Sequence, residues 1–177
     1  MRTIGIILAF ALGAFWGVVF AQVARNRGRA TIRLIRRITA SPESIITLVS
    51  QVERESEIIP FVRSVYILSQ GHNWVRYRVT LGLVFSLAQV VYRKSWDKEK
   101  RFIQWRSESG SLRLAHSGRI TFSPTSEGWL MRLSTEYAFR TPVIGWLLTA
   151  LAQVPLALAL WIWLRRLASN ERRERRP

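Results

Sequence analysis

The amino-acid sequence predicts an α+β fold in which a long C-terminal helix covers the apolar face of an antiparallel sheet, with an N-terminal transmembrane helix ahead of this domain. Three observations predict it. An uncharged apolar run occupies residues 4–24, segments of alternating apolar and polar side chains fill residues 62–139, and a second apolar run covers residues 143–164. A chain of 177 residues has room for one domain with membrane segments, so two large catalytic domains are excluded.

The first apolar run is long enough to cross a bilayer. At 1.5 Å per residue a helix over Ile4–Ala24 spans roughly 30 Å, the thickness of the hydrocarbon core. A signal peptide cleaved after Val19-Phe20-Ala21 is the alternative, and the six arginines that follow the run oppose export. We therefore expect residues 1–24 to form an uncleaved anchor. Its expected lipid contacts are Ile4, Phe15, Trp16 and Phe20.

Most of the positive charge lies beside the two apolar runs. The net charge is +16, yet residues 38–164 hold fourteen Lys and Arg against nine Asp and Glu, which is only +5. This distribution predicts a basic linker at 25–29, a basic tail at 169–177, a cytoplasmic domain by the positive-inside rule, and no nucleic-acid partner. The arginines expected to contact lipid headgroups are Arg25, Arg27, Arg29, Arg165 and Arg166.

The domain begins with a strand and a short helix. Residues 31–39 alternate, with Ile32, Leu34 and Ile38 on one side and arginines on the other, which indicates a strand. Ser41 then has the side chain of a helix cap, and Pro42 suits the first helical position. The helix is expected to run to about residue 52, and Pro60 is expected to end a second short helical stretch.

Successive strands follow between residues 62 and 139, divided by turns at 70–73, 97–100, 109–110 and 124–128. The segment with Val75, Tyr77 and Val79 carries Arg76 and Arg78 on its opposite face. This pattern predicts an antiparallel sheet with one face in the core and the other in solvent.

A helix over residues 142–168 is expected to cover the apolar face of the sheet. It carries no charge before Arg165, and Pro155 is expected to bend it. We expect one face to pack on the sheet and the other to touch the membrane surface or a second protomer, as in a homodimer. A second membrane span over 143–164 is an alternative, because Trp146, Trp161 and Trp163 resemble an interfacial aromatic belt. The third interpretation is a helix that covers the sheet without any membrane contact.

Five short motifs occur in a fixed order along the chain. They are Ala40-Ser41-Pro42-Glu43, Val52-Glu53-Arg54 with Glu57 and Pro60, Trp105-Arg106-Ser107, Gly118-Arg119-Ile120-Thr121-Phe122-Ser123-Pro124, and Phe139-Arg140-Thr141-Pro142. In this order, across residues 30–164, they resemble the START-like (SRPBCC) superfamily of polyketide cyclases, coenzyme Q-binding proteins and lipid-transfer domains. The START-like domain is expected to cover residues 30–168. The chain departs from many relatives at Glu55-Ser56, at Ile120 and in its apolar last helix.

The resemblance implies a helix-grip fold, in which a curved antiparallel sheet wraps around the long C-terminal helix. It also implies an apolar cavity between the sheet and this helix that takes a lipid, a quinone or a polyketide. The residues expected to line it are Tyr77, Trp105, His116, Ile120, Met131, Tyr137, Leu147 and Leu151. A lone inward histidine such as His116 is more often a satisfied core group than a ligand or a base, and His72 falls in a turn.

The chain lacks the residues of most catalytic and metal chemistries. It has no Cys, one Asp and two His, so it predicts no disulfide, no zinc set and no cofactor. The leading hypothesis is a membrane-tethered, non-enzymatic module that binds or presents a hydrophobic small molecule. An accessory or assembly protein of a membrane complex is the alternative. A cyclase or hydrolase built on His116 comes third, because no carboxylate is in phase with it on the strands.

Overall fold

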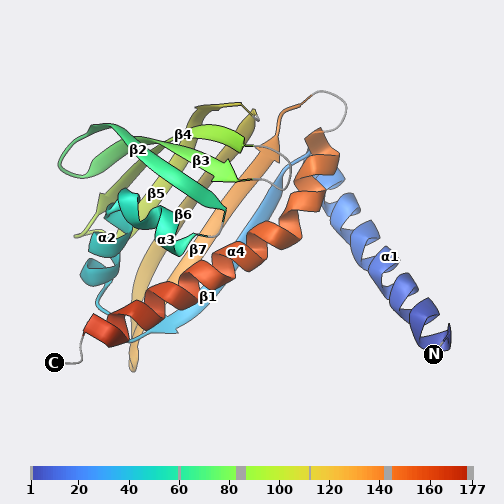
Figure 1. The fold of residues 1–177 in the computed structure, drawn as a ribbon. Coiled ribbons are helices and arrows are strands. Elements are labelled where there is room, and N and C mark those ends of the chain that lie inside the picture. Colours follow the sequence, from blue (N-terminus) through green and yellow to red (C-terminus); the bar gives the residue numbers. More distant parts are fainter. Residues whose placement is uncertain (1, 60, 83–86, 112, 142–144, 175–177) are drawn as a thin grey trace.

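The computed structural model describes residues 2–59, 61–82, 87–111, 113–141 and 145–174 (Figure 1). Within these ranges the side chains of residues 2–13, 58, 87, 164 and 166–174 are outside the description. The predicted helix boundaries at Pro60 and Pro142, and the side chains of Ile4 and Arg166, therefore lie outside the described part of the chain.

The elements follow one another in this order: α1 (Arg2–Arg25), β1 (Ala30–Ile38), α2 (Pro42–Ser50), a 3₁₀ turn η1 (Val52–Arg54), α3 (Glu55–Ile58), β2 (Val62–Gln70), β3 (Trp74–Gly82), β4 (Leu87–Asp97), β5 (Phe102–Gly110), β6 (Leu114–Thr125), β7 (Gly128–Phe139) and α4 (Gly145–Glu174). The predicted α+β class is confirmed. The last helix extends beyond the predicted end at residue 168.

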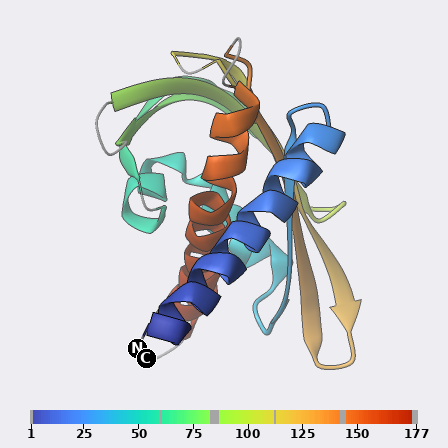
Figure 2. The same cartoon turned by 90° about the vertical axis from the view of Figure 1, so that its right-hand side faces the viewer.

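The seven strands form one antiparallel sheet in the order β1-β7-β6-β5-β4-β3-β2. The first strand of the chain therefore pairs with the last, from Ala30 opposite Tyr137 to Ile38 opposite Trp129. Irregularities in the β2–β3 and β4–β5 pairings add to the bend of the sheet. The sheet curves around α4, and α2 and α3 lie on the same side of it as α4 (Figures 1 and 2).

The alternation of the strands sets which face of the sheet is buried. On β3, Val75, Tyr77 and Val79 are at most 3 % exposed, while Arg76 and Arg78 are exposed. The arginines keep their charges in water and the apolar side chains leave it, which fixes the register. The predicted division into a core face and a solvent face is confirmed for this strand.

Helix α2 starts where the sequence predicts. Ser41 has extended backbone geometry, and its hydroxyl accepts a hydrogen bond from the Ser44 amide at 3.2 Å. Pro42 occupies the first helical turn, where its missing N–H costs nothing. The buried face of α2 places Ile45 and Ile46 against the sheet, and each buried aliphatic side chain contributes roughly 1.5–3 kcal/mol.

Helix α4 lies across the inner face of the sheet and contacts two clusters of core residues. Near its C-terminal half, Trp163 packs with Ile103, Ile120 and residues of α2. Near its N-terminal half, Ala150 packs with Tyr137. Pro155 lies inside the helix, which remains continuous across it.

Helix α1 packs on α4 near its own C-terminal end. Val19 and Val23 are 6 % and 0 % exposed, and the Phe20 ring meets Trp146 edge to face at 5.8 Å between centroids. After Arg25 the chain turns sharply, because the Gly28 amide bonds the Val23 carbonyl at 2.9 Å while Arg27 adopts φ 54°. The two helices meet toward the C-terminal end of α1, and toward its N-terminus α1 points away from the sheet (Figures 1 and 2).

Candidate functional site

The inner face of the sheet brings together six of the eight residues predicted to line a cavity. Four of them are almost fully buried: Tyr77 at 3 %, Ile120 at 0 %, Met131 at 1 % and Tyr137 at 1 % exposed. Trp105 and His116 are half-buried and lie with their rings 6.2 Å apart. These residues come from β3, β5, β6 and β7, and their position on one face follows from the period of two along each strand.

Helix α4 contributes only one of its two predicted residues to the interior. Leu147 is half-buried, whereas Leu151 is 45 % exposed and lies on the outward face of α4. The expectation for Leu151 was wrong because the sequence of α4 is apolar on all sides. Its composition therefore does not show which residues face the sheet.

His116 is held inside by a network of neutral hydrogen bonds. Its Nδ1 lies 2.9 Å from the Tyr92 hydroxyl, and its Nε2 lies 2.8 Å from Thr135 Oγ1. Thr135 donates its proton to the Ser117 carbonyl at 2.9 Å, so its oxygen accepts from Nε2–H and Nδ1 accepts from Tyr92. With this tautomer the 3.4 Å approach of Trp105 Nε1 to Nε2 is a ring contact rather than a hydrogen bond.

Burial lowers the pKa of His116 to about 4. The imidazole is therefore neutral near pH 7, and both of its nitrogens have partners. Burial likewise raises the pKa of Tyr92, whose hydroxyl remains protonated. The hydrogen-bonded network of Tyr92, His116 and Thr135 therefore orders the interior, and neither imidazole nitrogen is free to act as a base.

A second polar cluster on the inner face joins β3, β4 and α3. Lys94 is 3 % exposed, and its Nζ donates to the Val49 carbonyl at 3.1 Å and to Glu55 Oε1. Tyr77 donates to the same Glu55 oxygen at 3.1 Å. Burial, followed by the charge of Glu55, raises the pKa of the Tyr77 hydroxyl. The ion pair thus keeps one positive and one negative charge inside, each with hydrogen-bond partners.

The sequence analysis missed Lys94 and Glu55. Lys94 does carry a signal, because it alternates in phase with Val90, Tyr92 and Trp96 on β4. Glu55 lies on the four-residue helix α3, which is too short to show a periodic pattern. Because Glu55 is not on a strand, the alternation of side chains along the strands does not reveal this carboxylate.

The two polar clusters lie next to each other. The Tyr77 and Tyr92 rings stack at 5.9 Å between centroids, so a line of polar groups runs along the inner face from Lys94 to Thr135. Two further buried oxygens have no hydrogen-bond partner among the described residues: the Tyr137 hydroxyl on β7 and the Gln153 Oε1 on α4.

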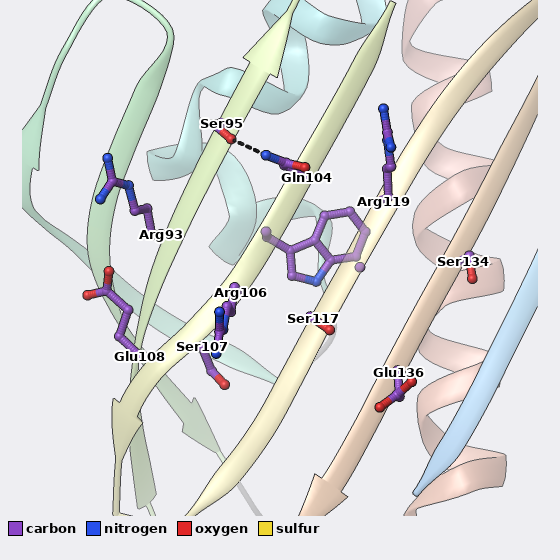
Figure 3. A pocket seen from close by; sticks show the side chains of 12 residues that line it. Arg93, Ser95, Gln104, Arg106, Ser107, Glu108, Ser117, Arg119, Ser134 and Glu136 are labelled. Carbon is purple, nitrogen blue, oxygen red and sulfur yellow. Dashed lines mark hydrogen bonds between the residues drawn. The ribbon is translucent and has the colours of Figure 1, made fainter.

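The outer face of the sheet, turned away from α4, carries a separate polar hollow of about 940 Å³ (Figure 3). Arginines from three neighbouring strands line it: Arg93 on β4, Arg106 on β5 and Arg119 on β6. Serine hydroxyls and the Gln104 amide fill the space between them, and Gln104 donates to Ser95 at 3.1 Å. No feature of the sequence analysis pointed to this hollow.

Large apolar side chains are exposed on α4 and on the adjoining part of α1. Leu151, Val154, Leu158 and Trp161 are 41–55 % exposed along one side of α4. Among the described residues, the stretch Gly145–Trp163 is long and apolar enough to cross a membrane, and 22 % of it is buried. This length and composition are typical of a membrane span and of a core helix alike.

The remaining predicted contact residues lie near these helices. On α1, Phe15 is 49 % exposed, while Trp16 and Phe20 are half-buried. Arg25, Arg27, Arg29 and Arg165 are exposed. Arg29 forms an ion pair with Glu136 at 3.1 Å, and Arg165 lies 5.5 Å above the Trp161 ring. Within the described ranges no three His, Cys, Asp or Glu side chains gather in a way that could hold a metal ion.

The architecture defines a helix-grip domain, a curved antiparallel sheet closed by a long C-terminal helix. The chain belongs to the polyketide cyclase/dehydrase and lipid transport family, whose model matches residues 29–169. The resemblance to the START-like superfamily is thereby confirmed. No curated protein sequence matches this chain.

Three solved structures share the fold. The protein TTHA0849 from Thermus thermophilus is 23 % identical, with a TM-score of 0.68 over 79 % of this chain and 95 % of its own. The ZhuI aromatase/cyclase from Streptomyces sp. R1128 is 16 % identical, with a TM-score of 0.64 over 84 % and 97 %. A START superfamily protein from Mycobacterium smegmatis is 16 % identical, with a TM-score of 0.62 over 80 % and 97 %. At these identities the likeness concerns the fold alone.

Proposed function

We propose that this protein is a membrane-tethered START-like module that binds or presents a hydrophobic small molecule between the sheet and α4. The ligand class is a lipid, a quinone or a polyketide-like compound. One observation carries the proposal: the Tyr137 hydroxyl and Gln153 Oε1 are buried without partners. Leaving such a group unpaired costs about 1–3 kcal/mol, and a carbonyl or hydroxyl of a bound ligand would recover that energy.

The surroundings of these two atoms suit a mostly apolar ligand. Gln153 lies in the stretch of α4 whose Ala152, Leu156 and Ala157 pack on the cluster that contains Tyr137. Ligand sites of this kind combine an apolar lining with few polar groups that fix orientation.

The membrane tether rests on α1 and on the outward side of α4. The N-terminal part of α1 points away from the sheet, so it is free to enter a bilayer (Figure 1). The exposed Leu151, Val154, Leu158 and Trp161 would then lie on the membrane surface. A hydrophobic ligand would pass beneath α4 from the bilayer to the interior with little exposure to water.

A second candidate function is an accessory or assembly protein of a membrane complex. The close packing of the inner face favours it, since Ile120, Met131 and Tyr137 are at most 1 % exposed. An enzymatic role is the weakest candidate, because His116 is neutral with both nitrogens bonded. We assign no catalytic residue.

The test is mass spectrometry of small molecules that co-purify with the full chain in a mild neutral detergent. The wild type is compared with Gln153→Leu, which removes the unpaired oxygen at similar volume, and with Gln89→Leu, a matched change at an exposed position. A near-stoichiometric compound that is retained by the wild type and Gln89→Leu, and depleted from Gln153→Leu, supports the proposal. Extracts without such a compound from folded protein favour the accessory function.

A further inference from the structure

Three arginines lie side by side in one row across the outer face of the sheet. Arg76 on β3 is directly opposite Arg93 on β4, and Arg93 is directly opposite Arg106 on β5. Like charges in directly opposed positions destabilise a sheet, because their side chains are only about 5 Å apart at the Cβ atoms. A row of three in consecutive strands therefore works against folding unless negative charge offsets it.

The carboxylates nearest this row are already paired with other arginines. Glu108 accepts from Arg76 Nε at 2.6 Å, and Glu136 accepts from Arg29 at 3.1 Å. Among the described residues neither Arg93 nor Arg106 has an ion pair with a carboxylate, and the same holds for Arg119 in the neighbouring row. Glu108 and Glu136 also line the hollow, and each is paired with an arginine outside it, so the three arginines of the hollow have no carboxylate partner among the described residues.

The shape and composition of the hollow indicate the kind of anion that would offset them. A hollow of about 940 Å³ is in the range of small-molecule sites, which is about 300–1,000 Å³. The guanidinium groups of Arg93, Arg106 and Arg119 present forked N–H donors, which match the oxygens of phosphate. The hydroxyls of Ser117 and Ser134 add neutral donors beside them (Figure 3).

We propose that this hollow is a binding site for a soluble small molecule that carries phosphate groups. The site is distinct from the proposed hydrophobic site, because its arginines lie on the face of the sheet turned away from α4. Trp105 also lines the hollow, and its ring contacts Trp163 of α4. A membrane that contacts the outward side of α4 would lie on the opposite side of the sheet, so lipid headgroups do not reach the hollow. A single nucleic-acid strand fits less well, since Arg93 and Arg119 cover the rings of Trp74 and Phe102 on which bases would stack.

The test measures binding of inorganic pyrophosphate to the full chain in neutral maltoside micelles by calorimetry, with KCl of equal ionic strength as the reference. The variants are Arg106→Gln and Arg119→Gln, and the matched control is Arg78→Gln. Arg78 is exposed on the same face of β3 but does not line the hollow. We expect each hollow variant to weaken binding at least about tenfold, as the loss of a charge-assisted hydrogen bond does, and the control to change it less than about twofold.

Thermal unfolding in phosphate-free buffer distinguishes a role of Arg106 in ligand binding from a role in stabilising the fold. Arg106→Gln should leave the melting temperature unchanged or raise it at low salt, because it removes repulsion from Arg93. Pyrophosphate should then raise the melting temperature of the wild type more than that of the variant.

Several results would overturn the proposal. One is binding no stronger than that of chloride, and another is an equal loss of affinity in Arg78→Gln, which would mean general attraction to a basic surface. A third is a loss of binding to phosphatidylglycerol vesicles in Arg106→Gln while pyrophosphate has no effect, which would assign the arginines to lipid headgroups. Tighter binding of a single-stranded oligonucleotide than of pyrophosphate, dependent on Arg106, would also reject the small molecule.

Discussion

Acidification should destabilise this fold through His116. The folded protein holds the pKa of this imidazole at about 4, against 6.5 for an unperturbed histidine. Above pH 6.5 both states are neutral at this position, and stability does not depend on it. Between pH 6.5 and 4 only the unfolded state takes up the proton, so the free energy of unfolding falls. At about 1.36 kcal/mol per pH unit, this interval gives a loss of roughly 3 kcal/mol by about pH 4.

The assay is urea unfolding of the full chain in neutral detergent, followed by tryptophan fluorescence at half-unit steps from about pH 7.5 to about pH 4. His116→Gln keeps one donor and one acceptor but cannot titrate, so its stability should fall by roughly 3 kcal/mol less than that of the wild type. His72→Gln is the matched control, because His72 is exposed in the turn between β2 and β3. Carboxylates titrate alike in all three proteins, and the differences isolate His116.

Two results would refute this reasoning. If the wild type and His116→Gln lost stability in parallel down to about pH 4, the imidazole would not be held neutral by burial. If His72→Gln removed the pH dependence instead, the effect would come from the surface.

Three further predictions concern the interior and the membrane face. Tyr137→Phe removes a buried hydroxyl without a partner, so it should stabilise the ligand-free protein by about 1 kcal/mol in urea unfolding; a destabilisation would mean that the hydroxyl is bonded. Lys94→Met leaves Glu55 buried without its cation and should lower the free energy of unfolding by about 3–5 kcal/mol. The double variant Lys94→Met/Glu55→Leu should recover most of that loss. Losses that add up in the double variant would contradict the pairing. The chain has no native cysteine, so Leu158→Cys and Tyr66→Cys each introduce a single thiol at an exposed position. In reconstituted vesicles a water-soluble maleimide should label position 158 at least about tenfold more slowly than position 66, and the two rates should be equal after denaturation. Equal labelling rates in the vesicles would argue against membrane contact at α4.

The sequence was sufficient for the parts of the fold that depend on local signals. The alternation around Val75, Tyr77 and Val79 predicts the inner face of β3, and Ser41 with Pro42 predicts the start of α2. Five short motifs, each of a few residues, were enough in their order along the chain to predict the superfamily. These features depend on residues within a few positions of one another, which a single sequence displays.

Features that depend on pairing between distant strands could not be predicted in the same way. The row of Arg76, Arg93 and Arg106 exists only because of the registers of two strand pairs, one of which contains a shift between Val91 and Tyr92. A change of one residue in either register would scatter these charges over both faces of the sheet. The Glu55 carboxylate reaches Lys94 from a helix, 39 residues away along the chain.

The pairing of β1 with β7 has a consequence for synthesis. Ile38 ends β1 and Gly128 begins β7, so about 90 residues must be added before the first strand meets its partner. At roughly 5–20 residues per second, β1 waits about 5–20 s with its backbone groups unpaired. Such an edge attracts other chains, and charged side chains on it reduce that hazard. Arg33 and Arg37, both exposed on β1, are charges of the kind that lower this hazard.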